Sequence, residues 1–196
     1  METVKKTRKE QAQETKQRLF DVAFQMLSSK PFEEIKIRDI VEAAGVSIGT
    51  FYLYYKTKLD VFYETYVIAD SYFDTTVRAN LSKVKTTPEK IRKYFKAYAE
   101  YSSDITSLAL TKVLYNSENK KFNRDTENGM HSLLLEIVTD GIKNGEIKSK
   151  DNAKDISKFL LIAARGQVYD WCTMDGSYSL EKAMDAMISK LLNIYL

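Results

Sequence analysis

Residues 36–55 read KIRDIVEAAGVSIGTFYLYY, and no other stretch of the chain says more about its fold. The pattern is typical of two short helices joined by a tight turn. Gly45 lies where the first helix should end, at a position that favours the positive φ that glycine adopts without strain. Val46 can plug the gap between the helices, and Ser47 can cap the second helix by accepting a backbone N–H. We expect Phe51 to point back into the core, which makes the stretch a helix-turn-helix.

The outer face of the second helix then carries exposed apolar side chains beside a tyrosine. Such a face suits contact with base edges and thymine methyl groups in the major groove of DNA, while neighbouring hydroxyl and ammonium groups reach phosphates. The plainer alternative is an ordinary helical hairpin, but the cap, the glycine, the plug and the lysine all agree in register. The residues expected at DNA are Ser47, Ile48, Gly49, Thr50, Tyr52, Leu53, Tyr54 and Lys58, of which Thr50, Tyr54 and Lys58 would reach phosphates.

Composition places this motif in an all-helical protein. The chain has 196 residues, 44% of them apolar, so it can bury a real core. Two prolines and seven glycines leave few helix breakers, and the apolar spacing indicates about nine helices. No apolar run approaches the ~18–20 residues that would span a membrane. With a single cysteine, Cys172, and no secretory signal, we expect a cytoplasmic protein.

The net charge of +3 is too small to indicate a nucleic-acid partner by itself, but its distribution is informative. Residues 1–18 hold six lysines and arginines against three glutamates. A basic N-terminal arm of this kind can supply phosphate contacts. A solvated tail explains the same charges, and both interpretations stay open.

Apolar spacing and capping signals give the expected helix boundaries. A first helix should begin at the cap Thr15 and end at Lys30-Pro31, because the residue before proline resists the helical region. Residues 32–41 allow a strand or a short helix, and the helix is preferred because no partner strand is found elsewhere. A single long helix should run over residues 58–81. Later boundaries are expected at Thr87-Pro88, at Gly145, at Asp151 or Asn152, and at Ser177 or Ser179.

The chain is rich in aromatic residues, with thirteen tyrosines and nine phenylalanines, most of them after residue 50. Tyrosines could line a pocket in which rings supply area and hydroxyls supply orientation, although packed core residues are the plainer interpretation of each one. Arg165 and Gln167 interrupt an apolar helix and could meet a ligand's polar end or hydrogen-bond across an interface. The candidate ligand-binding residues are Tyr66, Tyr72, Tyr98, Tyr101, Tyr115, Arg165, Gln167 and Tyr169.

The sequence contains few of the residues that catalytic sites use. One histidine, His131, and one cysteine cannot build a metal cluster or a His-based nucleophilic site, and no glycine-rich phosphate loop occurs. Cys172 has no strongly basic sequence neighbours, so an inert buried thiol is favoured over a redox sensor. We therefore expect no enzyme, no metal and no cofactor. The alternative to a DNA-binding protein is a helical carrier of hydrophobic molecules, which would explain the aromatic body but not the helix-turn-helix.

Residues 15–62 resemble the DNA-binding domain of the TetR family of repressors. Residues 38–55, followed by Lys58, follow that family's pattern almost position by position. Two later segments, GIKNGEI at 141–147 and ARGQVYDW at 164–171, are similar to weaker family signatures. The resemblance implies a homodimer with an N-terminal reading head and a helical body that binds an inducer. It favours a repressor that a small molecule, mostly apolar or aromatic, releases from operator DNA.

Two domains are expected on this basis. Residues 1–57 should form the DNA-binding head with its basic arm, and residues 58–196 the body for ligand binding and dimerisation. The last two helices, 151–173 and 179–195, carry broad apolar faces close to the end of the chain. We expect them to pack against their copies as a four-helix dimer interface.

Two positions depart from the family pattern. Members of the family often have lysine or glutamine where this chain has Ile48, so one hydrogen-bonding base contact should be missing. The family's second helix usually starts with a serine or threonine cap, but the matching residue here is Lys36, so that end should be frayed or capped by solvent. By resemblance, Arg38 and Tyr52 remain as the expected base readers.

Overall fold

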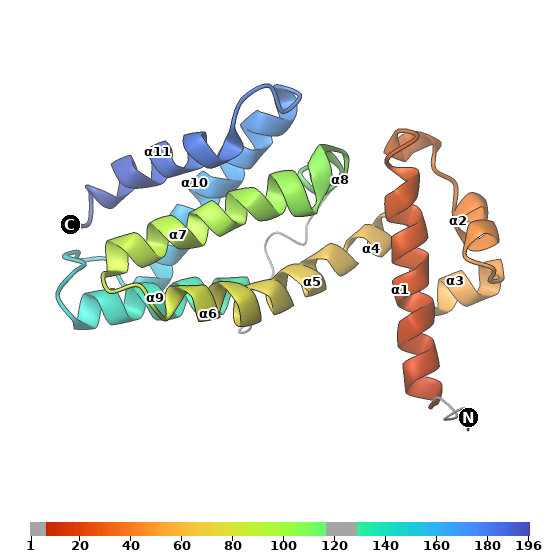
Figure 1. Cartoon of the computed structure of the whole chain (residues 1–196), viewed down its shortest axis with the longest axis horizontal. Helices are drawn as coiled ribbons and strands as arrows, with labels where there is room; N and C mark the ends of the chain where they lie inside the picture. Colours follow the sequence, from red (N-terminus) through yellow and green to blue (C-terminus); the bar gives the residue numbers. More distant parts are fainter. Residues whose placement is uncertain (1–6, 117–128) are drawn as a thin grey trace. The chain divides into compact units, whose positions relative to one another are not determined.

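The computed structural model describes residues 7–116 and 129–196, and Figure 1 shows them as helices joined by turns. No strand occurs within these two ranges, so the prediction of an all-α fold is confirmed. The described residues form eleven α-helices by strict boundaries, or nine when the interrupted run over 58–81 is counted once. The chain divides into two compact units, Met1–Glu64 and Thr65–Leu196. None of the described helices is both long and apolar enough to cross a membrane.

The first unit is a small helical head. Helix α1 packs against α2 and α4, and α2 packs against α3. The side chains between them are fully buried, among them Leu19, Ile40, Phe51 and Phe62. This packing fixes one face of each short helix and leaves the other face to solvent. The elements are α1 (Arg8–Met26), the 3-10 turn η1 (Phe32–Glu34), α2 (Ile37–Ala43), α3 (Ile48–Tyr54) and α4 (Lys58–Phe62).

Helix α1 begins earlier than the sequence predicts. The Thr7 hydroxyl accepts the Glu10 N–H at 3.2 Å, and the Glu10 carboxylate accepts the Thr7 N–H at 2.7 Å. This capping box satisfies the first N–H groups of the helix, so the start expected at Thr15 is wrong. Thr15 lies inside the helix and donates its hydroxyl to the Gln11 carbonyl. The predicted basic arm is therefore helical from residue 8 onward, and its residues 1–6 lie outside the described residues.

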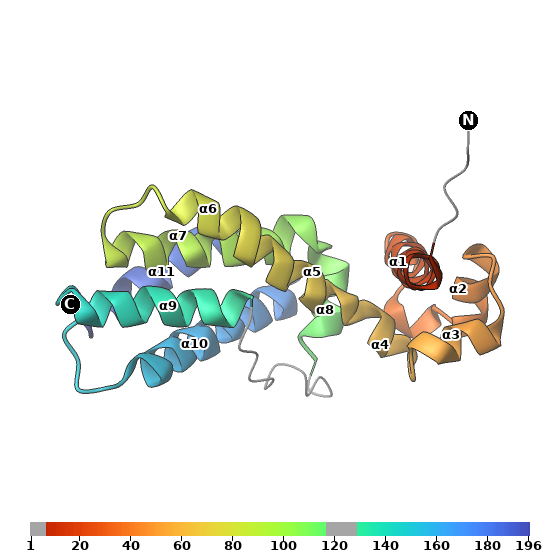
Figure 2. The same cartoon turned by 90° about the horizontal axis from the view of Figure 1, so that it is seen from below.

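The second unit is a bundle of helices around one large core. Figure 2 shows α7, α9, α10 and α11 side by side; α7 packs against α9 and α11, and so does α10. Tyr94, Phe95 and Leu134 are fully buried at the centre of this arrangement. The elements are α5 (Glu64–Tyr72), the π-turn η2 (Phe73–Val77), α6 (Arg78–Leu81), α7 (Thr87–Glu100), the π-turn η3 (Tyr101–Ile105), α8 (Ser107–Leu114), α9 (Met130–Lys143), α10 (Ala153–Thr173) and α11 (Leu180–Leu192).

The single helix expected over residues 58–81 is wrong in two places. At Tyr63 the backbone N–H donates to the Asp60 carbonyl at 3.2 Å, three residues back, and the α-helix is interrupted between α4 and α5. In η2 the turn widens to a π-helix, which takes up one extra residue. Phe73 and Val77, at its two ends, are both buried, so the wider turn keeps them on the core side.

The division between the two units falls after Glu64, seven residues beyond the domain boundary expected after residue 57. Helix α4 is counted with the head because it packs against α1. The sequence gives no sign of this, since α4 and α5 continue one apolar pattern.

Most of the capping predictions are confirmed. Asn152 caps α10 and Ser179 caps α11, each through a side-chain oxygen that accepts a backbone N–H. Gly145 follows α9 with a φ of +73°, as a C-terminal glycine should. At α7 the cap residue is Thr86, one position before the expected Thr87, which lies inside the first turn.

Candidate nucleic-acid interface and ligand cavity

The turn between α2 and α3 has the geometry that the sequence predicts. Gly45 has a φ of +65°, and the Val46 N–H closes the end of α2 by donating to a carbonyl of that helix at 3.0 Å. The Ser47 hydroxyl accepts the Thr50 N–H at 3.0 Å and caps α3. Phe51 is fully buried. These contacts fix the direction in which α3 leaves the turn.

Helix α3 presents its other side chains to solvent. Leu53 is 78% exposed, Tyr52 55% and Ile48 48%. Exposed apolar area is unfavourable by about 25 cal/mol per Å² relative to burial, so a partner that covers this face lowers the free energy. The major groove of DNA offers thymine methyl groups and polar base edges to such a face. The remaining candidate residues of this helix are exposed or half-buried: Ser47, Gly49, Thr50 and Tyr54.

The start of α2 is held by protein atoms. The Asp39 carboxylate accepts the Lys36 N–H at 3.4 Å and pairs with the Lys30 ammonium at 2.7 Å. The hydrogen bond from Lys30 holds the pKa of Asp39 below its ordinary value. The expectation of a frayed or solvent-capped end is therefore wrong, because a carboxylate in the first turn replaces the missing serine or threonine. Arg38, the residue before Asp39, is exposed on this helix.

Lys58 lies at the start of α4 and is partly withdrawn from solvent. Its ammonium donates to the Phe32 carbonyl at 2.5 Å and to the Glu33 carbonyl at 3.4 Å, and it lies 4.1 Å from the centre of the Phe32 ring. This partial burial lowers the pKa of Lys58. An ammonium group has three N–H donors, so one more acceptor, such as a phosphate oxygen, can join the two carbonyls.

The residue after α3 is an anchor that the sequence analysis did not single out. Tyr55 is buried, and its hydroxyl donates to the Lys16 carbonyl of α1 at 3.3 Å. The Lys16 ammonium pairs with Glu64 at 2.6 Å. Burial, and after it the Glu64 carboxylate, raises the pKa of Tyr55.

Two exposed lysines, Lys36 and Lys56, were not among the expected DNA contacts. Each lies just before the start of a helix that flanks the motif, where positive charge suits phosphates.

The second unit holds a cavity of about 60 Å³ whose walls come from α5, α7, η3, α8, α9 and α10. The Tyr98 and Tyr115 hydroxyls lie 2.6 Å apart, and the Tyr101 hydroxyl donates to the Thr65 carbonyl at 3.1 Å. Burial raises the pKa of Tyr98 and of Tyr115. Five predicted ligand-binding residues line this cavity: Tyr66, Tyr98, Tyr101, Tyr115 and Arg165.

Three predicted ligand-binding residues lie outside this cavity. The Gln167 amide donates to the Tyr178 hydroxyl at 2.8 Å, and the Tyr169 side chain is 56% exposed. The Tyr72 ring packs against Tyr101 with ring centroids 5.5 Å apart, but it does not line the cavity. Arg165 therefore lines the cavity and Gln167 does not, although the sequence made both of them candidates for contact with a ligand's polar end.

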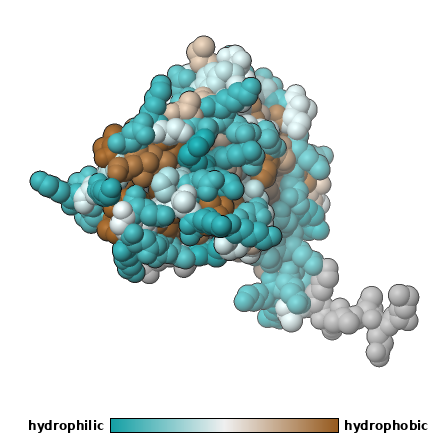
Figure 3. Space-filling view, turned by 60° about the vertical axis from the view of Figure 1, so that its left-hand side comes forward, coloured by the Kyte–Doolittle hydropathy of each residue, from teal (hydrophilic) through white to brown (hydrophobic). Residues whose placement is uncertain are grey.

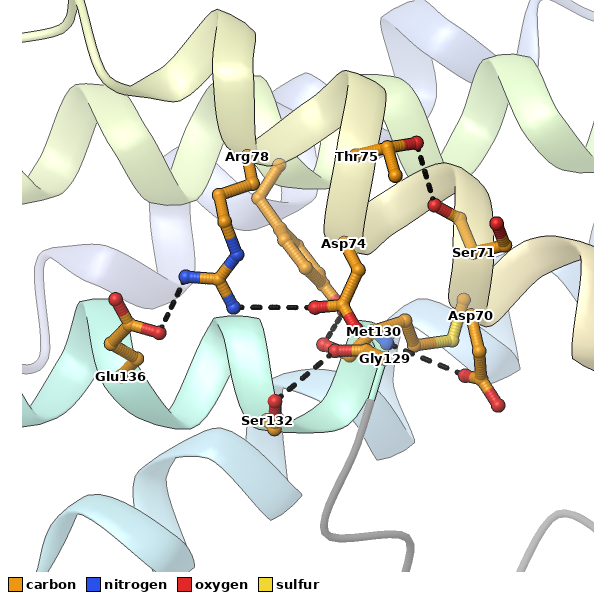
Figure 4. A network of polar contacts seen from close by, with 10 residues as sticks. Asp70, Ser71, Asp74, Thr75, Arg78, Gly129, Met130, Ser132 and Glu136 are labelled. Carbon is orange, nitrogen blue, oxygen red and sulfur yellow. Dashed lines mark hydrogen bonds and ion pairs between the residues drawn. The ribbon is translucent and has the colours of Figure 1, made fainter.

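A polar network fixes the start of α9 (Figure 4). Arg78 pairs with Glu136 at 2.6 Å and with Asp74 at 3.3 Å, and so joins α6 and η2 to α9. The Asp70 carboxylate accepts the Met130 N–H at 3.4 Å. Because Met130 also lines the cavity, this network positions part of the cavity wall.

Residues 19–65 match the family model described as bacterial regulatory proteins, tetR family. The chain is 24% identical over 181 residues to the fatty acid metabolism regulator protein of Bacillus subtilis (strain 168), which covers 89% of this chain and 92% of that protein. It is 36% identical over 63 residues to the HTH-type transcriptional regulator AcrR of Shigella flexneri, or 32% of this chain and 29% of that protein.

Two solved structures share the fold. FadR of Bacillus subtilis in complex with stearoyl-CoA has a TM-score of 0.72 at 21% identity, covering 90% of this chain and 97% of that one. FadR of Thermus thermophilus in complex with lauroyl-CoA has a TM-score of 0.70 at 20% identity, covering 90% and 92%.

A capped helix with an exposed reading face, on a chain that also carries a helical body with a cavity, defines a helix-turn-helix DNA-binding regulator. The curated relatives are regulators rather than enzymes. Residues 19–65 match the tetR family of bacterial regulatory proteins, so the resemblance drawn from residues 38–55 is confirmed, and the fold of the whole chain is the one that the FadR structures share.

Proposed function

We propose that the chain is a homodimeric repressor that a small molecule releases from operator DNA. The observation that carries the proposal is the exposed face of Ile48, Tyr52 and Leu53, held in place by the buried Phe51. A carrier of hydrophobic molecules would gain nothing from this face or from the capped turn that orients it. Its work on chromosomal DNA would place the protein in the cytoplasm.

Base recognition is assigned to the exposed side chains of α3 and α2. Tyr52 and Arg38 carry the hydrogen-bonding groups, while Ile48 and Leu53 offer apolar contact to thymine methyl groups. Because Ile48 has no hydrogen-bonding group, it selects by shape and apolar contact only. Phosphate contacts are assigned to Thr50, Tyr54 and Lys58, which position the head without reading sequence.

The dimer interface is assigned to α10 and α11. The outer face of α10 carries Phe159, Ile162 and Tyr169, which are 41%, 55% and 56% exposed. Gly166 lies between them at helical spacing, and a Cβ added there would meet no atom within 4 Å. On the face of the body in Figure 3, hydrophobic surface forms patches between hydrophilic side chains. These four residues form an apolar stripe on α10, which α10 and α11 of a second copy would cover.

The inducer is assigned to the cavity in the second unit. Ring faces of four tyrosines supply apolar contact, and Arg165 supplies a polar end. The FadR proteins that share this fold bind stearoyl-CoA and lauroyl-CoA, whose acyl chains are likewise apolar. This precedent supports a mostly apolar or aromatic inducer.

Selection of bound fragments from the source genome tests the proposal. We expect a small set of sequences to be enriched, and a labelled duplex of one of them to bind the dimer with a Kd that rises steeply with salt. Leu53→Ala should weaken this binding, whereas Leu135→Ala, at an exposed leucine of α9, should not. A protein that enriches no sequence and retards no fragment would be a carrier instead.

A further inference from the structure

One side of the cavity carries hydroxyl groups that are already bonded to the chain itself. The Thr111 hydroxyl donates to the Ser102 carbonyl at 2.6 Å and lies 2.7 Å from the Thr106 hydroxyl. The Ser102 hydroxyl donates to the Tyr98 carbonyl at 2.9 Å. These bonds satisfy carbonyl groups around the π-turn η3, where the helical ladder is widened. They leave little hydrogen-bonding capacity for a ligand on this side.

The Thr65 hydroxyl differs from these groups. Thr65 is 3% exposed and lines the cavity, and its hydroxyl has no hydrogen-bond partner among the described residues. Its carbonyl accepts the Tyr101 hydroxyl, so the backbone around it is held in place. Buried polar groups without a partner are rare in proteins, and each one calls for a reason. An oxygen atom of a bound molecule is such a reason.

Charges of both signs lie around the cavity. Arg165 lines it, and the Asp70 carboxylate accepts the N–H of the lining residue Met130 at 3.4 Å (Figure 4). Burial raises the pKa of Tyr94, Asp70 adds to this rise, and Arg165 opposes it, so both charges act on the same phenol. Arg165 and Asp70 are both engaged within the chain. Arg165 therefore offers a ligand a polar surface rather than a free charge.

The other ionisable groups of the wall supply no counter-charge. Burial raises the pKa of Tyr98, Tyr101 and Tyr115, which keeps these hydroxyls neutral. His131 also lines the cavity and is engaged within the chain, as Arg165 is. A charged ligand would lose its hydration in this cavity without gaining an unpaired group of opposite charge, which is unfavourable. The cavity therefore favours an uncharged ligand.

The size of the cavity limits the ligand further. Its volume is about 60 Å³. An engineered apolar cavity of roughly 150 Å³ holds benzene, which is about 25 Å³ for each of six ring atoms. At the same packing the cavity takes roughly two or three non-hydrogen atoms, and the flexible Met130 side chain in its wall makes room for one or two more. A long acyl chain does not fit into this space.

We infer that the cavity binds a small uncharged molecule, an alcohol or a ketone of about two to four carbon atoms, whose oxygen completes the hydrogen bonding of Thr65. Its carbon atoms lie against the tyrosine rings and the aliphatic side chains of Ala69, Leu114 and Met130. The inference rests on the proposed function, because it names the chemical class of the inducer. It separates this chain from the FadR proteins of the same fold, whose structures contain stearoyl-CoA and lauroyl-CoA.

The test compares probes of nearly equal size and different charge on the full-length protein. Saturation-transfer NMR titrations give the Kd of 1-propanol, acetone, propionate and propylammonium, and methanol and 1-octanol extend the range of sizes. For a ligand of so few atoms we expect a Kd in the millimolar range for 1-propanol and acetone. Propionate and propylammonium should bind at least about tenfold more weakly, because each brings an uncompensated charge into the cavity. Methanol and 1-octanol should also bind more weakly than 1-propanol.

Variants of Thr65 test the proposed hydrogen bond. Thr65→Val keeps the shape and removes the hydroxyl, and should weaken 1-propanol binding about threefold to tenfold, while Thr65→Ser should recover most of the affinity. Without alcohol, Thr65→Val should raise the melting temperature, because a buried hydroxyl without a partner is removed. The matched control is Ser157→Ala, since the Ser157 hydroxyl is buried without a partner among the described residues but lies outside the cavity lining. This variant should bind 1-propanol as the parent does.

Four results would overturn the inference. The first is that propionate, propylammonium or 1-octanol binds as tightly as 1-propanol, and the second is that neither 1-propanol nor acetone binds. The third is that Thr65→Val and Ser157→Ala change the affinity equally, which would mean non-specific binding. The fourth is that Thr65→Val lowers the melting temperature, since the hydroxyl would then already have a partner, such as a water molecule. Operator binding by the parent protein is measured without any probe, so it tests the proposed repressor independently.

Discussion

Gly141 of α9 approaches Thr87 of α7 so closely that no side chain fits between them. A Cβ built on Gly141 would lie 2.4 Å from the Cγ2 atom of Thr87. The same threonine donates its N–H to the Glu146 carboxylate at 2.7 Å, which ties the start of α7 to the turn after α9. The contact between glycine and threonine therefore sets the approach of two central helices of the body.

Gly141→Ala should destabilise the protein by about 1–3 kcal/mol, because overpacking outweighs the better helix propensity of alanine. Urea unfolding followed by circular dichroism measures this. Gly49→Ala is the control: Gly49 is also helical, but the added Cβ would meet only the Ser47 hydroxyl oxygen at 3.6 Å. It should be neutral or stabilising by up to about 1 kcal/mol. Equal effects of the two substitutions would contradict the close contact.

The slope of log K against log salt is negative for DNA binding. Lys58→Met should reduce its magnitude by about one unit, because one phosphate contact is lost. The measurement is fluorescence anisotropy with an operator duplex at several salt concentrations. Lys190→Met, at an exposed lysine of α11, should leave the slope unchanged. An unchanged slope together with a lower unfolding temperature would assign Lys58 to its bonds with Phe32 and Glu33 alone.

Tyr52→Ala should change which base pairs are preferred rather than the salt dependence. Loss of one base-reading side chain should reduce discrimination by roughly 1–3 kcal/mol at one or two positions of each half-site. Binding to a library of single-base operator variants measures this. A uniform loss across all variants would make Tyr52 a phosphate contact.

Ile162→Asp should weaken the dimer by a hundredfold or more, since a charge at the centre of an apolar interface is desolvated without a partner. Sedimentation velocity over a range of protein concentrations measures the equilibrium between monomer and dimer. Val67→Asp is the control, because Val67 is 59% exposed on α5, outside the stripe on α10. A dimer that survives Ile162→Asp unchanged would place the interface elsewhere.

Cys172 should react slowly with thiol reagents while the protein is folded. Burial raises the pKa of its thiol to about 11, so at pH 8 the thiolate fraction is roughly 100-fold below that of an exposed cysteine. The unfolded chain deprotonates first as pH rises, so this group's contribution to stability is lost between about pH 9 and 11. Reaction with a disulfide reagent, with and without urea, measures the difference. Equal rates in the two states would mean that the thiol is accessible.

Local signals were sufficient to predict the helix-turn-helix. Gly45, Ser47 and Phe51 act within a few residues of their own positions, and each is found in the predicted role. The cap at Thr7 was missed because the charged run after it hid a helix that has few apolar residues at its start. The role of Asp39 at the start of α2 was not predicted, because the cap residue is a lysine, whose ammonium cannot accept a backbone N–H and so gives no capping signal.

The cavity could be predicted only in part, because its walls come from helices that are distant in sequence. Arg165 and Gln167 are two residues apart on α10, so at about 100° per residue they point in opposite directions and cannot meet the same ligand end. The proposed dimer interface could also be predicted only in part. Both last helices have broad apolar faces, but Met187 and Leu191 of α11 pack against the protein's own core, whereas Ile162 of α10 does not.

The π-turn η3 has a consequence for how the gene can change. Removing one residue from 101–105 would leave the chain one residue short between Tyr101 and Thr106, whose N–H donates to the Tyr101 carbonyl at 3.0 Å across the wide turn. The hydroxyls of Thr106 and Thr111, which bond to the carbonyls of Tyr101 and Ser102, would then no longer be matched to these acceptors. In this segment the number of residues is therefore under the same constraint as their identity. Insertions and deletions should be tolerated in the exposed turn at residues 149–151 instead, between the Lys148 N–H that bonds to Tyr195 and the cap residue Asn152.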